Sequence, residues 1–272
     1  MNEPIDLTGY TWHKLSEAGT SHGSLYKVTL NYNGKTYFLK LSMIIGKEVV
    51  GHESINEVIV SRLLDVLKLP HTRYDLIVAK IKIKDDIFVA PICVSESFVH
   101  DNETAIPLEE YCTLRNVEPL VAMKTLGFQE YLDRLFAVDF LIANRDRHGY
   151  NIELLQNTGR IYPAPLFDNG FSFVAPLQND IDLIQAFNPM RDVVTNNYIG
   201  SQSLYDNLKQ IEQPLVVSPL TKQSRRYIFY KLSSFVSKEH LDKIWDIIWM
   251  RYHYLLDNGY IQEVSAETSI FT

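Results

Sequence analysis

Ile142-Ala-Asn-Arg-Asp146-Arg-His148-Gly-Tyr-Asn151 is the most informative segment of this sequence, together with Pro165-Leu-Phe-Asp168-Asn-Gly170 a little further on. The two segments contain an acid, an imidazole, an amide and a second acid, all at expected ends of helices or strands. Asn151 follows Asp146 by five residues, and Asp168 follows Asn151 by 17. This order suits phosphoryl transfer from a Mg²⁺-nucleotide, because one carboxylate can lie beside the attacking hydroxyl while an amide and a second carboxylate hold the metal.

The composition argues against several other classes of protein. The chain has 272 residues, 46% of them hydrophobic and 22% charged, which is enough for one large domain or two lobes. A net charge of −7 argues against direct nucleic-acid binding, which depends on neutralising phosphates. Two cysteines are too few for a disulfide framework, so we expect a cytoplasmic protein. The first residues carry no signal-peptide pattern, and charges interrupt the longest apolar runs, so we expect no membrane span.

The first part of the chain is typical of a small sheet that carries one helix. Asn33-Gly34 predicts a hairpin turn between strands at 24–30 and 35–42, because both residues accept a positive φ. Apolar residues spaced for one face predict a helix over Glu53–Leu67, which Pro70 follows. Two more strands are predicted at 74–83 and 87–94. The polar stretch that follows, up to residue 104, is the expected boundary between lobes.

The rest of the chain has mainly helical patterns. Helices are predicted at 107–114, 117–124, 128–142, 221–236 and 238–258, and a short hairpin is predicted from 152–155 and 160–162. This hairpin would bring Asn151, at its entry, close to Asp168, just past its exit. Residues 176–218 show no clear pattern. We therefore expect an α+β, bilobal protein-kinase-like fold, with a β-rich N-lobe at 1–98 and a larger helical C-lobe at 99–272.

Lys40 is the expected cation for the nucleotide phosphates. It alternates with apolar neighbours in Phe38-Leu-Lys40-Leu41, and its ammonium needs a partner on the following helix. Glu53 and Glu57 are both available, and we favour Glu57, because an unpaired acid in the middle of a buried helix would be costly. The alternative is an ordinary solvated lysine on a strand.

Each catalytic candidate also has a plainer interpretation. Asp146 is the expected catalytic base that positions the attacking hydroxyl, yet alone it is equally typical of an exposed charge pair on a loop. Asn151 and Asp168 offer the hard oxygen ligands that Mg²⁺ prefers, yet both residue types are common in turns. His148 either orients Asp146, donates to a phosphate oxygen or is an ordinary loop histidine. The joint occurrence in one order favours function: Lys40, Glu57, Asp146, Asn151, Asp168.

The two opening segments resemble the catalytic and metal-binding loops of HipA-like serine/threonine kinases, and the first is similar to the Asp-Arg-His-x-x-Asn loop of phosphatidylinositol kinases. The resemblance includes Lys40 and the Asn56-Glu57 helix, and so covers most of residues 10–175. It implies that Asp146 is the catalytic aspartate. The ligand roles that it implies are Mg²⁺ binding by Asn151 and Asp168, ATP-phosphate binding by Lys40 with Glu57 as its partner, a phosphate loop containing Ser21, Gly23 and Ser24, and an adenine-binding hinge near Glu96 and Phe98.

The same resemblance implies ATP-dependent phosphorylation of protein serine or threonine. Some relatives are toxins of toxin–antitoxin pairs that act on aminoacyl-tRNA synthetases. The implied partners are therefore a protein substrate, such as a synthetase or another translation factor, and an antitoxin or other regulatory protein. Some relatives autophosphorylate, which makes Ser21 or Ser24 a candidate regulatory site. Asn144 and Asn169 stand where ordinary protein kinases have the His and Phe of their catalytic and metal-binding triplets, which leaves the substrate open.

Two rival functions remain at this stage. A lipid or small-molecule kinase would present a basic, apolar surface near its site, and the acidic chain argues mildly against an anionic lipid. A non-catalytic nucleotide-binding module, or pseudokinase, usually lacks one of the ionic groups, and here all of them are present.

Overall fold

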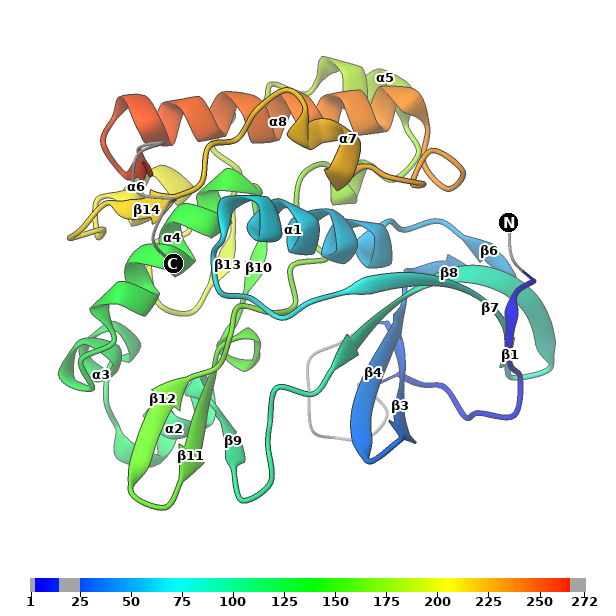
Figure 1. Cartoon of the computed structure of the whole chain (residues 1–272), viewed down its shortest axis with the longest axis horizontal. Coiled ribbons are helices and arrows are strands. Elements are labelled where there is room, and N and C mark those ends of the chain that lie inside the picture. Colours follow the sequence, from blue (N-terminus) through cyan, green and yellow to red (C-terminus); the bar gives the residue numbers. More distant parts are fainter. Residues whose placement is uncertain (1–2, 15–24, 265–272) are drawn as a thin grey trace.

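The computed structural model describes residues 3–14 and 25–264, so the phosphate-loop residues Ser21, Gly23 and Ser24 lie outside the described residues. Figure 1 shows a curled sheet beside a larger, mainly helical part. Within the described residues the sheet has the order β1-β7-β8-β4-β3-β2, and only the β1–β7 pair is parallel. Its strands are β1 (Ile5–Leu7), β2 (His13–Lys14), β3 (Tyr26–Tyr32), β4 (Lys35–Leu41), β7 (Asp75–Ile83) and β8 (Asp86–Glu96). A small hairpin, β5 (Ile44–Ile45) and β6 (Glu48–Val49), follows β4.

The hairpin of β3 and β4 turns at Asn33-Gly34, as the sequence predicts. Both residues have positive φ, 50° and 75°, the backbone that a two-residue hairpin turn requires. The turn fixes the register, which places Lys27 directly opposite Lys40. Side chains of directly paired residues point to the same face of a sheet. Both lysines therefore project from one face of this hairpin.

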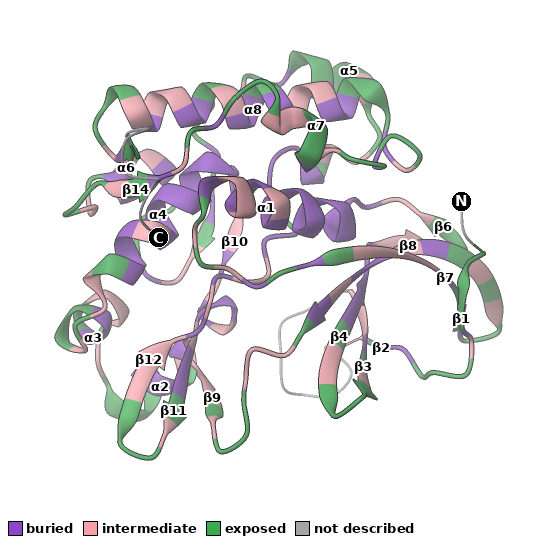
Figure 2. Cartoon of the chain, viewed as in Figure 1, coloured by how far each residue is buried: buried purple, intermediate pink, exposed green. Residues whose placement is uncertain are grey.

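Helix α1 (Glu53–Leu67) lies between the sheet and the helical part (Figures 1 and 2). Nearly all of it is buried, since one side packs against the sheet and the other joins the large apolar core of the helices. Its first turn is tied to β4, because Ser54 donates its hydroxyl to the Lys40 carbonyl at 2.8 Å and its N–H to the Ser42 hydroxyl at 2.9 Å. The helix ends at Lys68, whose φ of 57° is the left-handed conformation that stops helices.

The helical part follows the sheet in the chain. Its longer helices are α2 (Leu108–Arg115), α3 (Pro119–Thr125), α4 (Gln129–Leu141) and α8 (Lys238–Asp257), and its shorter ones are α5 (Ile181–Ala186), α6 (Leu204–Leu208) and α7 (Ser224–Ile228). The predicted hairpin forms from β11 (Glu153–Asn157) and β12 (Arg160–Pro163), and β9 (Thr104–Pro107) adds a third strand to it. Short pairs join β10 (Asp146–Arg147) to β13 (Asn196–Asn197) and β14 (Leu215–Val217) to β15 (Ile261–Glu263). The fold is thus mixed α+β, as predicted.

One predicted helix is much shorter in the structure. The pattern over 221–236 predicts a continuous helix, but α7 ends at Ile228 and the chain continues in turns. The Arg62 guanidinium of α1 donates hydrogen bonds to the backbone carbonyls of Ile228 and Tyr230, at 3.1 and 2.9 Å. These oxygens therefore bind the arginine instead of accepting the backbone N–H groups that would continue a helix. Lys231 then adopts a φ of 61°. No helix among the described residues has the length and apolar character needed to cross a membrane.

The position of α1 between two layers makes its core side chains a direct test of the fold. Leu63 is fully buried. We expect Leu63→Ala to lower the free energy of unfolding by about 2–5 kcal/mol, because it removes buried methyl groups and leaves a cavity. Leu114→Ala is the matched control, since Leu114 is 80% exposed, and should change stability by less than about 0.5 kcal/mol. Urea unfolding measures both, and equal effects would contradict this placement of α1.

Candidate active site

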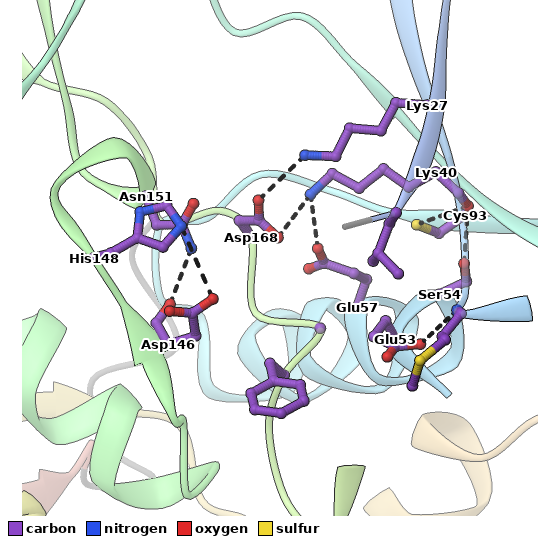
Figure 3. Close-up of a pocket in the computed structure, with 14 residues that line it drawn as sticks. Lys27, Lys40, Glu53, Ser54, Glu57, Cys93, Asp146, His148, Asn151 and Asp168 are labelled. Carbon is purple, nitrogen blue, oxygen red and sulfur yellow. Dashed lines mark hydrogen bonds and ion pairs between the residues drawn. The ribbon is translucent and has the colours of Figure 1, made fainter. Parts of the chain in front are cut away.

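A cavity of about 230 Å³ opens between the sheet, α1 and the two loops that the sequence singles out (Figure 3). Lys27 and Lys40 enter it from β3 and β4, and Glu57 enters it from α1. Asp146, His148 and Asn151 line it from residues 144–151, which we call the catalytic-type loop, and Asp168 lines it from the loop after β12. The structure therefore brings these seven charged or polar side chains, from segments far apart in the sequence, to one hollow.

Lys40 lies at the centre of the ionic contacts in this cavity. Its ammonium is 3.0 Å from Glu57 Oε1 and 3.0 Å from Asp168 Oδ1. The carboxylate of Glu53, the other candidate partner, instead accepts from the Met43 N–H at 3.1 Å. Lys27 reaches the second oxygen of Asp168, with Nζ 3.7 Å from Oδ2. Two lysines thus face one carboxylate, and Glu57 balances the second positive charge.

The pKa shifts of these groups follow from burial opposed by pairing. Burial lowers the pKa of Lys40, but Asp168 and Glu57 more than compensate, so its pKa is raised and the ammonium stays charged. Burial raises the pKa of Asp168, but Lys40 and Lys27 outweigh it and hold that pKa well below its usual range. Burial raises the pKa of Glu57, with Lys40 acting in the opposite direction. Burial also raises the pKa of the Cys93 thiol to about 12, which makes it a poor nucleophile.

Helix α1 also fixes the loop that carries Asp168. Glu57 uses its second oxygen to accept the Asn169 N–H at 2.9 Å, and Asn56 donates its side-chain amide to the Gly170 carbonyl at 2.9 Å. Asp168 itself has a φ of 53°, an uncommon conformation for a residue other than glycine that aspartate tolerates better than most. These contacts hold the Asp168 carboxylate toward the two lysines.

Arg147 holds the catalytic-type loop in place through buried contacts. Its guanidinium is fully buried and pairs with Asp139 of α4, with Nη2 2.7 Å from Oδ1. The same group donates to the Phe167 carbonyl at 2.8 Å, to the Asn169 side-chain oxygen at 2.6 Å and to the Asn151 carbonyl at 3.2 Å. Burial lowers the pKa of Arg147, but Asp139 outweighs it, so the pKa is raised and the charge persists. One arginine therefore links the loop of Asp146 to the loop of Asp168.

Asp146 lies across the cavity from the lysines, with its carboxylate partly exposed. The Asn196 side chain donates to its Oδ1 at 2.9 Å, and His148 Nε2 is 3.9 Å from its Oδ2. Asn151 donates its side-chain N–H to the Asp146 carbonyl at 2.9 Å, which turns the amide oxygen away from this bond. Burial, with Asp168 and Glu110 adding to it, raises the pKa of the neighbouring Glu153 to about 7.

Glu96 and Phe98, the two residues expected at the adenine-binding hinge, are not among the described residues that line this cavity. The Glu96 carboxylate pairs with Lys35 at 2.9 Å on the exposed part of the sheet. The Phe98 ring packs against Phe167 at a centroid distance of 5.2 Å, next to the loop that leads to Asp168. Both lie at the end of β8, where the chain leaves the sheet.

Three residues of the site were missed from the sequence alone. Lys27 can be found by counting strand positions back from the Asn33-Gly34 turn, which pairs it with Lys40. Asp139 is an acid inside an otherwise apolar helix, a signal for a buried partner. Asn196 falls in the stretch without a pattern, and no local signal marks it.

Comparison with known proteins supports the fold. No protein-family model matches the chain, and no curated protein sequence matches it. Among solved structures, the Helicobacter pylori proinflammatory kinase CtkA aligns over 95% of this chain and 97% of its own, with 18% identity and a TM-score of 0.60. HipA from a Shewanella oneidensis MR-1 toxin–antitoxin complex with HipB and operator DNA aligns over 89% and 66%, with 15% identity and a TM-score of 0.45. A hydra Fam20 structure with sugar aligns over 96% and 88%, with 14% identity and a TM-score of 0.37. The kinase-like fold that the sequence predicts is therefore confirmed, because CtkA, a kinase, aligns over nearly the whole of both chains.

The buried Arg147–Asp139 pair should be essential to the stability of the two loops. We expect Arg147→Met to lower the free energy of unfolding by about 3–5 kcal/mol, because Asp139 would remain buried without its partner. The double variant Arg147→Met/Asp139→Leu should recover part of this loss, since no charge is then left buried alone. Lys124→Met is the control, because its pair with Glu212 is exposed and worth at most about 1 kcal/mol. Urea unfolding in which Arg147→Met resembled this control would contradict the prediction.

Proposed function

We propose that this protein is an ATP-dependent kinase that transfers the γ-phosphoryl group to a hydroxyl of a protein serine or threonine. The observation that carries the proposal is the ionic arrangement of Lys40, Glu57 and Asp168 on one side of a cavity and Asp146 on the other. A kinase fold supports it, since this arrangement occupies the cavity between sheet and helices.

The donor groups in the cavity fit a magnesium ion. Asp168 supplies a carboxylate that is 27% exposed toward the hollow, and Asn151 supplies an amide oxygen. Mg²⁺ is usually held by one or two protein oxygens, with phosphates and water completing its shell, so this small set is sufficient. Asn151 and Asp168 would hold the ion, which would neutralise charge on the phosphates.

The chain's own residues perform the remaining tasks. Lys40 and Lys27 bind phosphate oxygens, which replace their present contacts with Asp168. Asp146 accepts a hydrogen bond from the acceptor hydroxyl and takes up its proton as the hydroxyl oxygen forms a bond to the γ-phosphorus. The bond between that phosphorus and the oxygen bridging to the β-phosphate breaks, and ADP leaves with the electron pair. Asn196 holds the Asp146 carboxylate in place during this step.

Several finer features stay predictions from the resemblance of the catalytic loop. These are a translation protein as the substrate, an antitoxin or other regulatory partner, autophosphorylation at Ser21 or Ser24, a cytoplasmic location, and a lobe boundary after residue 98.

Substitution of Asp146 and substitution of Asp168 should impair different steps, phosphoryl transfer and Mg-ATP binding. We expect Asp146→Asn to bind Mg-ATP and yet transfer at least about 100-fold less label from γ-labelled ATP, because the base is lost while the phosphate site remains. Asp168→Asn should lose both binding and transfer, because it removes the carboxylate ligand. Calorimetry and label transfer into protein measure the two quantities in the same samples. Absence of Mg-ATP binding in the unchanged chain would overturn the proposal.

Lys27 offers a separate test of the phosphate side. We expect Lys27→Ala to raise the Kd for Mg-ATP by about tenfold, since a cation that faces the cavity is worth about 1.4 kcal/mol in this role. Lys35→Ala is the matched control on the same hairpin, because Lys35 lies on the surface and pairs with Glu96. Equal affinities of the two variants would show that Lys27 does not contact the nucleotide.

A further inference from the structure

A second hollow of about 440 Å³ adjoins Asp146. It is lined by Glu109, Asp146, His148, Gly149, Tyr150, Asn196, Asn197 and Tyr198. Asp146 and His148 line both this hollow, which we call the acceptor groove, and the cavity that holds the lysines. A group lying in the acceptor groove would therefore meet the same Asp146 that lines the cavity of the lysines.

One wall of the acceptor groove is built onto the catalytic-type loop. Strand β13 pairs in parallel with β10, so that Asn196 lies beside Asp146. The Asn196 N–H donates to the Arg145 carbonyl at 2.8 Å, and the Tyr198 N–H donates to the Arg147 carbonyl at 3.0 Å. The Asn196 side chain holds Asp146 Oδ1 at 2.9 Å. This wall thus has a fixed position relative to the proposed base.

The opposite wall comes from α2 and carries the acid Glu109. The backbone of Gly149 passes close to it, since a Cβ on this glycine would lie 2.5 Å from Glu109 Cβ. Only glycine permits this approach, which sets Glu109 directly beside the loop of Asp146. Burial raises the pKa of Tyr198, and the nearby Cys112 and Glu109 raise it further, so the tyrosine hydroxyl stays protonated.

The charge of the acceptor groove differs from that of the nucleotide cavity. Of the described residues that line it, none is a lysine or an arginine, whereas Glu109 and Asp146 are acids. An anionic acceptor, such as a phosphoinositide headgroup, would meet these acids with no lysine or arginine among the described lining residues to compensate. A segment that carries a positive charge near its hydroxyl would be attracted.

Building on the proposed kinase function, we propose that the acceptor groove binds a basic protein segment, with its serine or threonine hydroxyl at Asp146 and a nearby lysine or arginine paired with Glu109. The acceptor groove would then determine substrate specificity, and Glu109 would be its specificity-determining residue. The proton and phosphoryl movements are those of the proposed reaction.

The test uses the full chain with Mg-ATP and a set of peptides that each contain one serine. The peptides differ at a single position, one of the three residues on either side of the serine, which is arginine, alanine or aspartate. We expect the unchanged protein to favour arginine over aspartate in kcat/KM at one or more positions by at least about fivefold. Glu109→Ala should reduce this ratio toward one, and Glu109→Lys should reverse it. A merely structural role for Glu109 would lower all rates together and would not reverse the preference.

Glu110→Ala is the matched control, because Glu110 is the next residue of α2 and does not line the acceptor groove. It should keep the arginine preference of the unchanged protein. The same reaction is also run with vesicles that contain phosphatidylinositol, so that labelling of lipid and of peptide can be compared. Preferential labelling of the lipid, or an arginine preference that persists in Glu109→Ala, would overturn the inference while leaving the kinase function intact. Mg-ATP binding without transfer to any peptide would overturn it too, whereas absence of Mg-ATP binding would overturn the proposed function itself.

Discussion

The buried ammonium of Lys40 is the constraint on which the rest of the site depends. A charge removed from water is tolerated only when opposite charges and hydrogen bonds replace its hydration. Here two carboxylates supply them, each at 3.0 Å, and they come from α1 and from the loop after β12. Strand β4, α1 and that loop must therefore take up their positions together. Because Glu57 also binds the Asn169 N–H, a shift of α1 would disturb the lysine and the loop at the same time.

A second buried network depends on the same few residues. Arg147 and Asp139 pair beneath the catalytic-type loop, and Asn169 connects this pair to Lys40, since its N–H binds Glu57 while its side-chain oxygen binds Arg147. An apolar side chain at position 169 could not accept the arginine hydrogen bond. The asparagine in Asp168-Asn169-Gly170 thus joins the two buried networks through its side chain and its backbone.

Most of the fold follows from local patterns in the sequence, and the site follows only in part. The Asn33-Gly34 turn and the apolar face of α1 determine their elements within a residue or two, because turn conformation and helix periodicity are local properties. The predicted helix over 221–236 is wrong for a tertiary reason, because Arg62 donates hydrogen bonds to backbone carbonyls that would otherwise have continued the helix. Asn196 shows the same limit within the site. Its position is set by pairing of β13 with β10, 50 residues apart, and no local pattern records that contact.

The charges around Asp146 separate two kinds of ligand. On one side Lys27 and Lys40 supply two ammonium groups that phosphates can bind, whereas on the other side the described lining residues include Glu109 and no lysine or arginine. A polyphosphate finds cations only on the first side, whereas a basic segment on the second side meets an acid and no lysine or arginine among the described lining residues. Asp146 lies where the two regions meet, held by Asn196, so that a hydroxyl reaching it from the acceptor groove would face the nucleotide across a single carboxylate. Such a division favours productive binding of both substrates, because neither gains by occupying the place of the other.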